Sequence, residues 1–420
     1  MRVPISIIII NHNNDHLIDV VKNCITQLIS DDEIIIVNDD TNNISIVNSL
    51  KRKYSQIISI NAYEKKNNRN IGLRRAKNEI VLMIDGDILI DNNALDMVAS
   101  EFFREDVVAV TGFTHLMSYT FEQLLLLGFF QKYDYLQFSK MDILTDYPDL
   151  LDYRISYGDE KLNSDYNWVY FFTSFFAIHK GRIPKSVLFL DNLDGWGAED
   201  IEFAYQVSLS GCMRFNRNIN NIHIPHSRDH VKNLETNHKN LYFLLKEHPT
   251  LDFEVLLTFS SPGTTIARIK NMINVINHQN STTSFTTFRN SCLYTTLYSY
   301  DRQNIFVYGD NNKKYSLLGT ALPLSTQSVE TAYIDGAIMK YPTCIVSLIL
   351  REHLRIAKTV YIIGEIGEKT FIDDGYFKSH IIGYIDCPAV YDLRMFQFLC
   401  CDEGFQVNSS IPKYEICFDN

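Results

Sequence analysis

Three small groups of polar side chains have the residue types and spacing that chemistry requires. Asp85 and Asp87 end an apolar run, Glu199 and Asp200 follow a glycine-rich turn, and a pair of histidines comes later in the chain. Carboxylates and imidazoles bind divalent cations, and both can also accept or deliver a proton. Together the groups predict a metal-dependent group transfer on a phosphorylated donor.

The histidine pair has a spacing that needs a bend before both rings can meet. His223 and His226 are separated by two residues, which would place them on opposite faces of a straight strand. Pro225 lies between them and can end ladder pairing at that point. The spacing therefore fits a plain surface pair, and it equally fits a chelate completed by Asp87.

The second acidic pair lies at the start of a predicted helix. Glu199 and Asp200 precede an apolar pattern at helical spacing that ends at Gly211. A helix N-terminus favours ionised carboxylates, and a general base must be ionised when its substrate arrives. Ordinary capping by acids gives the same pattern. Trp196, between two glycines, favours a functional role, because an indole there could stack on a sugar ring.

The elements that must position these groups alternate between strand and helix. Apolar runs at residues 3–10, 33–37, 57–60 and 80–84 are separated by residues at helical spacing, which predicts a mainly parallel α/β sheet. Asn11 follows the first run, Asp39 the second, and Asp85 the fourth. Because the carboxyl ends of parallel strands meet at one crevice, we expect these polar ends to converge on one site.

Composition narrows the class of protein further. Hydrophobic residues make up 46% of the chain, which predicts a folded core, and the formal charge of -11 without a Lys/Arg block argues against a nucleic-acid partner. The eight cysteines include no C-x-x-C pair, which favours reduced thiols. No signal-peptide layout or apolar run of about 20 residues is present, so we expect a cytoplasmic protein. Peripheral membrane contact stays open.

Two α/β domains are predicted. Residues 1–240 would carry the site, and residues 241–300 would form a helical and linker segment that includes the polar stretch at 277–291. Short apolar runs at 305–308, 360–363 and 381–385, with a helical pattern at 344–356, predict a second, smaller α/β domain over residues 301–420. Its role is open, and self-association through it is one option.

These motifs together resemble GT-A-fold glycosyltransferases, which have a Rossmann-like mixed sheet. Asp85-Gly86-Asp87 resembles their DxD motif, and residues 195–200 resemble the WGxED motif of the acceptor half in family 2. Residues 223–229, which include His226-Ser227-Arg228-Asp229, are similar to the metal-binding strand end of animal β-galactosyltransferases. The bacterial chondroitin-polymerase type shares this plan. The resemblance covers about residues 3–229.

The resemblance implies a role for each matching residue. It implies a UDP-sugar donor and Mn²⁺, with Mg²⁺ as the alternative, and it assigns the metal to Asp87 and His226, with His223 as a further ligand. Asp200 matches the catalytic base of inverting members, while Glu199 and Trp196 match acceptor-binding residues. The positions that correspond to the donor site are Asn11, Asp39, Arg69, Asn70, Gly72, Asp85 and Asp87.

Four positions depart from the family pattern. His12 replaces an aromatic residue, Asn38 a frequent Asp, Asp40 a Gly, and Ala198 a Gly. The first three put the contacts to the nucleobase in doubt. The change at Ala198 looks small.

Our hypothesis from sequence is an inverting, metal-dependent glycosyltransferase that moves a sugar from a UDP-sugar to a glycan, such as a capsule or lipid-linked polysaccharide. A protein or peptide acceptor is the alternative within the class. A metallohydrolase could use the same acids and histidines but would not need Trp196, and a non-catalytic nucleotide-sugar-binding module is a further alternative. A dinucleotide oxidoreductase is disfavoured, because residues 11–14 contain no glycine.

Overall fold

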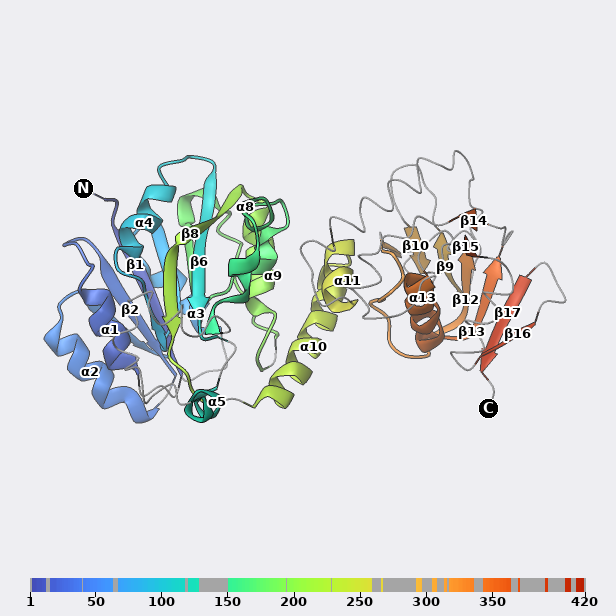
Figure 1. Ribbon diagram of the computed structural model, residues 1–420, viewed down its shortest axis with the longest axis horizontal. Coiled ribbons are helices and arrows are strands. Elements are labelled where there is room, and N and C mark those ends of the chain that lie inside the picture. The colour runs from blue at the N-terminus through green and yellow to red at the C-terminus, as the bar shows by residue number, and fades with distance from the viewer. Residues whose placement is uncertain are drawn as a thin grey trace. The chain divides into compact units, whose positions relative to one another are not determined.

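The structure is a computed structural model, shown as a ribbon in Figure 1. The chain divides into two compact units, Met1–Asn237 and His238–Asn420, and each is described by itself. The residues described are 2–12, 16–39, 41–62, 67–117, 120–127, 150–193, 195–227, 229–258, 266, 292–296, 304–307, 313–315, 317–335, 343–363, 369–370, 390–391, 405–408 and 413–418. Among residues named above, Asp40 and Arg228 lie outside these ranges, as do the stretches at 277–291 and 381–385.

The first unit is built on an eight-stranded mixed sheet with the order β3-β2-β1-β4-β7-β6-β8-β5. The four strands from β3 to β4 are parallel, and β7 runs antiparallel to both of its neighbours. The strands are β1 Ile5–Asn11, β2 Glu33–Asn38, β3 Ile57–Asn61, β4 Ile80–Asp85, β5 Ile88–Leu89, β6 Val107–His115, β7 Phe175–His179 and β8 Cys212–His223. The α/β fold and the mixed sheet expected from the sequence are confirmed.

Helices cover both faces of this sheet, so its central strands are buried throughout. Ile5, Ile7 and Ile9 of β1 belong to a core cluster with the apolar sides of α1, α2 and α4. Ile8 points the other way and packs on α3. Among the described residues of the unit, the helices are α1 Leu17–Ile25, α2 Ile44–Lys53, α3 Asn68–Arg75, α4 Ala94–Glu101, α5 Phe121–Leu126, α8 Asp159–Leu162 and α9 Glu199–Ser208, with 3₁₀ turns η1 Thr41–Asn43, η4 Tyr153–Ser156, η5 Asn167–Tyr170 and η6 Lys180–Arg182.

The short strand β5 determines where the site forms. It follows β4 after only two residues, yet it pairs with β8 at the edge of the sheet instead of with β4. In this antiparallel pair Ile88 lies opposite His223. The chain therefore carries Asp87 from the end of a central strand to the end of β8.

The second unit contains a seven-stranded sheet with the order β11-β10-β9-β12-β13-β17-β16. Its centre is a parallel unit in which α13 connects β12 to β13, an arrangement typical of α/β folds. The strands are β9 Cys292–Thr296, β10 Asn304–Val307, β11 Lys313–Tyr315, β12 Val329–Asp335, β13 Ala357–Ile363, β16 Phe405–Asn408 and β17 Lys413–Phe418, with β14 Lys369–Thr370 and β15 Val390–Tyr391 in a separate pair. Two of the expected apolar runs coincide with β10 and β13, and the expected helix coincides with α13.

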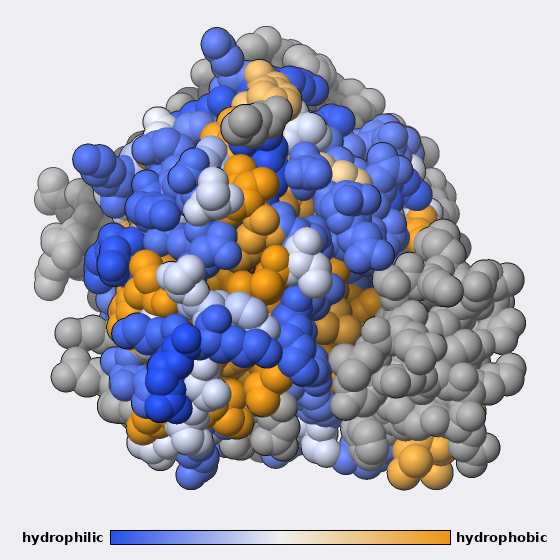
Figure 2. Space-filling view, turned by 90° about the vertical axis from the view of Figure 1, so that its left-hand side faces the viewer, coloured by the Kyte–Doolittle hydropathy of each residue, from blue (hydrophilic) through white to orange (hydrophobic). Residues whose placement is uncertain are grey.

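The described residues of this part of the chain include three further helices. They are α10 His230–Glu247, within which the division between the units falls, α11 Leu251–Thr258, and α13 Thr343–Ile356. In the described part of the chain, none of the helices has the length and apolar character needed to cross a membrane. The face shown in Figure 2 is largely hydrophilic, with hydrophobic side chains in smaller patches between the polar ones.

Candidate active site

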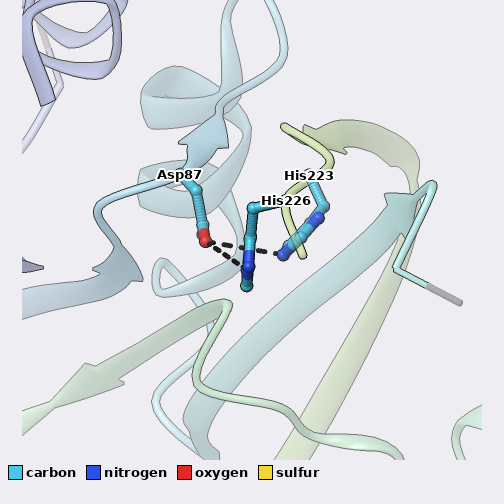
Figure 3. A group of neighbouring side chains, drawn as sticks. All are labelled: Asp87, His223 and His226. Carbon is cyan, nitrogen blue, oxygen red and sulfur yellow. Dashed lines mark ion pairs between the residues drawn. The ribbon is translucent and has the colours of Figure 1, made fainter. Parts of the chain in front are cut away.

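Asp87, His223 and His226 form a compact group of possible metal ligands. One ligand atom from each lies within 4.8 Å of the other two. The Asp87 Oδ2 atom is 3.5 Å from His223 Nε2 and 3.2 Å from His226 Nε2. Figure 3 shows the carboxylate pointing at both imidazole rings. The structure thus brings together the three residues that the sequence proposed as a chelate.

Backbone pairing explains why this group forms. Beyond the Ile88–His223 pair, the Ile224 N–H donates to the Asp87 carbonyl at 2.7 Å. β8 ends at His223, and the chain continues without regular structure through Pro225. The two imidazole rings then lie with centroids 5.3 Å apart and tilted by 39°. The bend expected at Pro225 is therefore present.

These side chains fit a divalent cation. One carboxylate oxygen and two imidazole nitrogens are the mixture that Mn²⁺, and other first-row ions, accept. His223 is 4% exposed and is held by its strand, whereas His226 is more open. His223 therefore gives the group a fixed, buried side, and His226 lies on the side that is open to solvent.

A second cluster of acids surrounds Arg69. Its guanidinium donates to Asp85 Oδ1 at 2.9 Å and lies 3.8 Å from Glu199 Oε1. Arg69 comes from α3, Asp85 from the end of β4, and Glu199 from the start of α9. Arg69 thus links Asp85 at the end of β4 to the first turn of α9, which carries Asp200.

Burial and, to a lesser extent, the neighbouring charges shift the pKa values of the acids in this cluster. Burial raises the pKa of Asp200 to about 7, with a further contribution from Glu199, while Arg69 opposes the shift. Burial also raises the pKa of Asp85, although Arg69 acts against it. The pKa of Arg69 is raised despite its burial, because Asp85, Glu199 and Asp200 favour its charged form. The helix N-terminus therefore does not by itself keep Asp200 ionised, which corrects the expectation from sequence.

The turn before α9 has an unusual backbone that explains its glycines. Gly195 and Gly197 have φ values of +71° and +104°, in the region that favours glycine. A Cβ on Gly197 would lie 2.5 Å from Asn237 Oδ1 on α10. Trp196, between them, is 53% exposed, and its carbonyl accepts a hydrogen bond from Thr236 Oγ1. The tight turn therefore presents the indole to solvent.

Ala198 shares this left-handed conformation. Its φ is +69°, and its side chain is buried. A left-handed conformation costs a residue with a Cβ about 1 kcal/mol or more relative to glycine. The substitution that looked small in the sequence therefore adds strain directly before the acidic pair.

The strand ends of β1 and β2 form a polar group at the donor side predicted from sequence. Asn11 Nδ2 donates to Asn38 Oδ1 at 2.6 Å, and both residues are fully buried. Asp39 accepts from Asn68 Nδ2 at 2.9 Å and lies 2.9 Å from His12 Nδ1. His12 is therefore a neighbour of Asp39, one of the positions that the resemblance assigns to the donor site, and it reaches solvent with 80% of its side chain exposed.

Asn70 and Gly72 have packing roles in α3. Asn70 exchanges two hydrogen bonds with the Phe189 backbone, at 2.8 and 2.9 Å. Gly72 packs on β1, where a Cβ would lie 2.5 Å from Ile8 Cγ2. Both residues thus fix the position of the helix that carries Arg69.

Three neighbours of this site were not found from the sequence. Asn68 binds Asp39, Asp191 accepts from the Asn67 N–H at 3.3 Å, and the Phe189 ring lies 5.7 Å from the Arg69 guanidinium carbon. Asn68 adjoins Arg69, so its position in the donor segment could have pointed to it. No spacing pattern marks Phe189 or Asp191, because they lie in a loop that reaches α3 only through the fold.

The fold and the site define the class of this domain. A Rossmann-like mixed sheet whose parallel strands end in acidic residues along one edge is the GT-A fold. Residues 6–177 match the family model described as glycosyl transferase family 2. The N-terminal unit is therefore a glycosyltransferase domain. The match ends before α9, so Asp200, His223 and His226 lie beyond it.

Three solved structures are similar in outline. A mannosyltransferase from Pyrobaculum calidifontis with GDP-Man and Mn²⁺ is 13% identical, with a TM-score of 0.40, over 59% of this chain and 62% of that one. GalNAc-T7 with UDP, GalNAc and Mn²⁺ is 12% identical, with a TM-score of 0.41, over 61% of this chain and 50% of that one. S. aureus TarS 1-349 is 14% identical, with a TM-score of 0.40, over 65% of this chain and 74% of that one. The chain thus spans less than two thirds of the first two. Because these TM-scores are low, the similarity does not indicate which donor or acceptor this chain uses. No curated protein matches the chain.

Proposed function

We propose that this protein is an inverting glycosyltransferase that uses a divalent cation, Mn²⁺ or Mg²⁺, to move a sugar from a UDP-sugar to a hydroxyl of a glycan. The observation that carries the proposal is the convergence of Asp87, His223 and His226 beside the acids around Arg69. The family 2 match supports the reaction class. We further propose that the enzyme acts in polysaccharide biosynthesis in the cytoplasm.

The metal would be held by Asp87, His223 and His226. When bound, a divalent cation offsets the negative charge of the departing nucleoside diphosphate. Asn11, Asp39 and Arg69 would bind the donor, with Asn70 and Gly72 holding α3 in place. Asp85 would orient Arg69 through their 2.9 Å hydrogen bond.

Asp200 would act as the general base. The acceptor oxygen bonds to the anomeric carbon as the bond from that carbon to the diphosphate oxygen breaks. The electron pair leaves with UDP, and the hydroxyl proton passes to the Asp200 carboxylate. The Ile201 N–H donates to Asp200 Oδ1 at 2.8 Å, which fixes the carboxylate at the helix start. Trp196 would stack on the acceptor sugar, and Glu199 would accept from its hydroxyls.

The test is a panel of nucleotide sugars measured by thermal unfolding with Mn²⁺, with Mg²⁺ and with EDTA. At a hundredfold excess over Kd, the right donor should raise the Tm of the first unit by about 5 to 11 °C, because it binds only the folded protein. Donor hydrolysis with the same sugar then measures turnover without any acceptor.

A matched pair of variants shows whether the predicted metal site is responsible. Asp87→Asn should abolish the metal-dependent shift, whereas Asp159→Asn, on an exposed helix start, should keep it. Equal shifts in both variants would overturn the metal assignment. Hydrolysis of simple phosphoesters without use of any nucleotide sugar would favour a metallohydrolase instead. Peptide acceptors tested beside glycans decide between the two acceptor classes.

A further inference from the structure

A pocket in the second unit lies outside the predicted transfer site. Its volume is about 690 Å³, within the range of about 300–1,000 Å³ that is usual for small-molecule sites. The walls come from α10, the end of α11, the loop at residues 317–324, and α13. All of the lining residues belong to the second unit, so the pocket is a feature of that unit alone.

The wall of this pocket carries excess positive charge, in contrast to the net acidic chain. Lys239, Lys246 and Arg355 line it, and Glu352 is the one carboxylate among the described lining residues. Glu352 is already engaged, because it accepts from Arg355 at 2.7 Å and from the Leu322 N–H at 2.6 Å. Across the described ranges, neither lysine has a carboxylate partner within ion-pair distance. Both ammonium groups are therefore available to an anion.

An aromatic ring and two hydroxyls accompany these cations. The Tyr242 ring centroid lies 4.8 Å from Lys246 Nζ and 5.7 Å from the Arg355 guanidinium carbon. Its hydroxyl donates to the Leu324 carbonyl, which holds the ring against the loop. Thr258 and Thr320 place their Oγ1 atoms 3.3 Å apart. Hydroxyls beside an aromatic face and ammonium groups suit a ligand with hydroxyls and a negative charge.

The loop that forms one wall is held in place by a buried acid. Glu254 of α11 accepts the N–H groups of Gly319, Thr320 and Ala321 through Oε1, at 2.6–3.2 Å, and that of Leu318 through Oε2 at 2.5 Å. The side chain is fully buried. Because four backbone donors end on one carboxylate, the wall is formed before any ligand arrives.

We propose that this pocket binds an acidic saccharide through a carboxylate or phosphate group. A nucleotide fits less well, because the described lining residues include no amide side chain and their only carboxylate is engaged, which leaves little to read a base edge. The inference goes beyond the proposed function, since it assigns a binding site outside the transfer centre. It takes from that function only the glycan nature of the ligand.

The experiment is direct binding by calorimetry with the full chain in EDTA and without donor. The probes are tetragalacturonate, its neutral methyl ester, glucose 6-phosphate, and UDP. Tetragalacturonate tests a carboxylate as the charged group, and glucose 6-phosphate tests a phosphate. We expect saturable binding of at least one acidic saccharide, weaker binding at high salt, and no binding of the methyl ester.

Charge-reversed variants test the location. Lys239→Glu with Lys246→Glu should weaken the acidic saccharide about tenfold or more, because two attractions become repulsions. Lys185→Glu with Lys232→Glu changes the net charge equally on exposed lysines elsewhere and should leave the affinity unchanged. Any one of four results would overturn the proposal. The first two are an equal loss of affinity in both double variants and binding of the methyl ester as tight as that of the acid. The other two are displacement of the acidic saccharide by UDP and no binding of either acid. This binding assay contains no metal and no donor, so a negative result would not bear on the proposed sugar transfer.

Discussion

The two units carry charged sites of opposite sign. In the first unit, Asp85, Glu199 and Asp200 surround one cation, Arg69, and burial raises the pKa of two of these acids. In the second unit, Lys239 and Lys246 face a pocket whose single carboxylate is already engaged with Arg355. The comparison therefore contrasts a buried acidic cluster that already contains one cation, Arg69, with an open basic pocket for which we propose an anionic ligand.

The largest expected effect is on the proposed base of the first unit. Asp200→Asn should lower the rate of sugar transfer by roughly 10³-fold, within the range usual for general-base catalysis, because an amide cannot take the acceptor proton. Transfer from the donor found in the nucleotide-sugar panel is the measurement. Glu235→Gln, an exposed acid on α10, is the control and should keep full activity. Normal transfer by Asp200→Asn would remove the base assignment.

The metal ligands come next. His226→Ala should weaken Mn²⁺ binding by about 100-fold, the scale on which metal sites respond to lost interactions, while acidic-saccharide binding in the second unit stays unchanged. Calorimetric titration with Mn²⁺ measures the first effect and titration with tetragalacturonate the second. Val231→Ala, an exposed neighbour, is the control. If both titrations changed together, the two sites would not be independent.

The pH dependence of transfer sharpens the role of Asp200. Its pKa is raised from 3.8 to about 7, by burial and by Glu199 on α9, with Arg69 on α3 acting against the shift and Asp85 on β4 adding to it. Below about pH 7 the protonated acid predominates, so kcat/KM should fall about tenfold per pH unit there and level off above. A profile that stays flat down to about pH 5 would contradict this assignment.

The smallest expected effect concerns the wall of the basic pocket. Glu254→Gln should lower the unfolding free energy of the second unit by about 1 to 3 kcal/mol, because its amide would face a buried N–H donor. It should also weaken tetragalacturonate binding while leaving Mn²⁺-dependent donor hydrolysis intact. Urea unfolding beside both assays is the measurement, with Glu330→Gln at an exposed position as control. Equal stability of the two variants would show that Glu254 does not hold the loop.

Much of the first unit could be predicted from local pattern. The Ile-rich runs become buried central strands because a parallel sheet covered on both faces excludes water from every side chain of β2 and from all those of β1 except Ile10. Their polar ends meet because parallel strands share one carboxyl edge, which places Asn11 near Asn38 and Asp39. The glycines beside Trp196 also have a local cause, since both adopt positive φ.

Tertiary structure decided which of these residues meet. The sequence contained Asp87, His223 and His226 as separate motifs, but only the pairing of β5 with β8 brings Asp87 to the histidines, because strand partners are chosen by packing across the sheet. Arg69 links Asp85 to Glu199 only because α3 packs closely on Ile8 through Gly72. The basic pocket depends on three helices and a loop that no local pattern relates. Spacing along the chain thus determined which chemical groups were available, and long-range packing determined their contacts and charges.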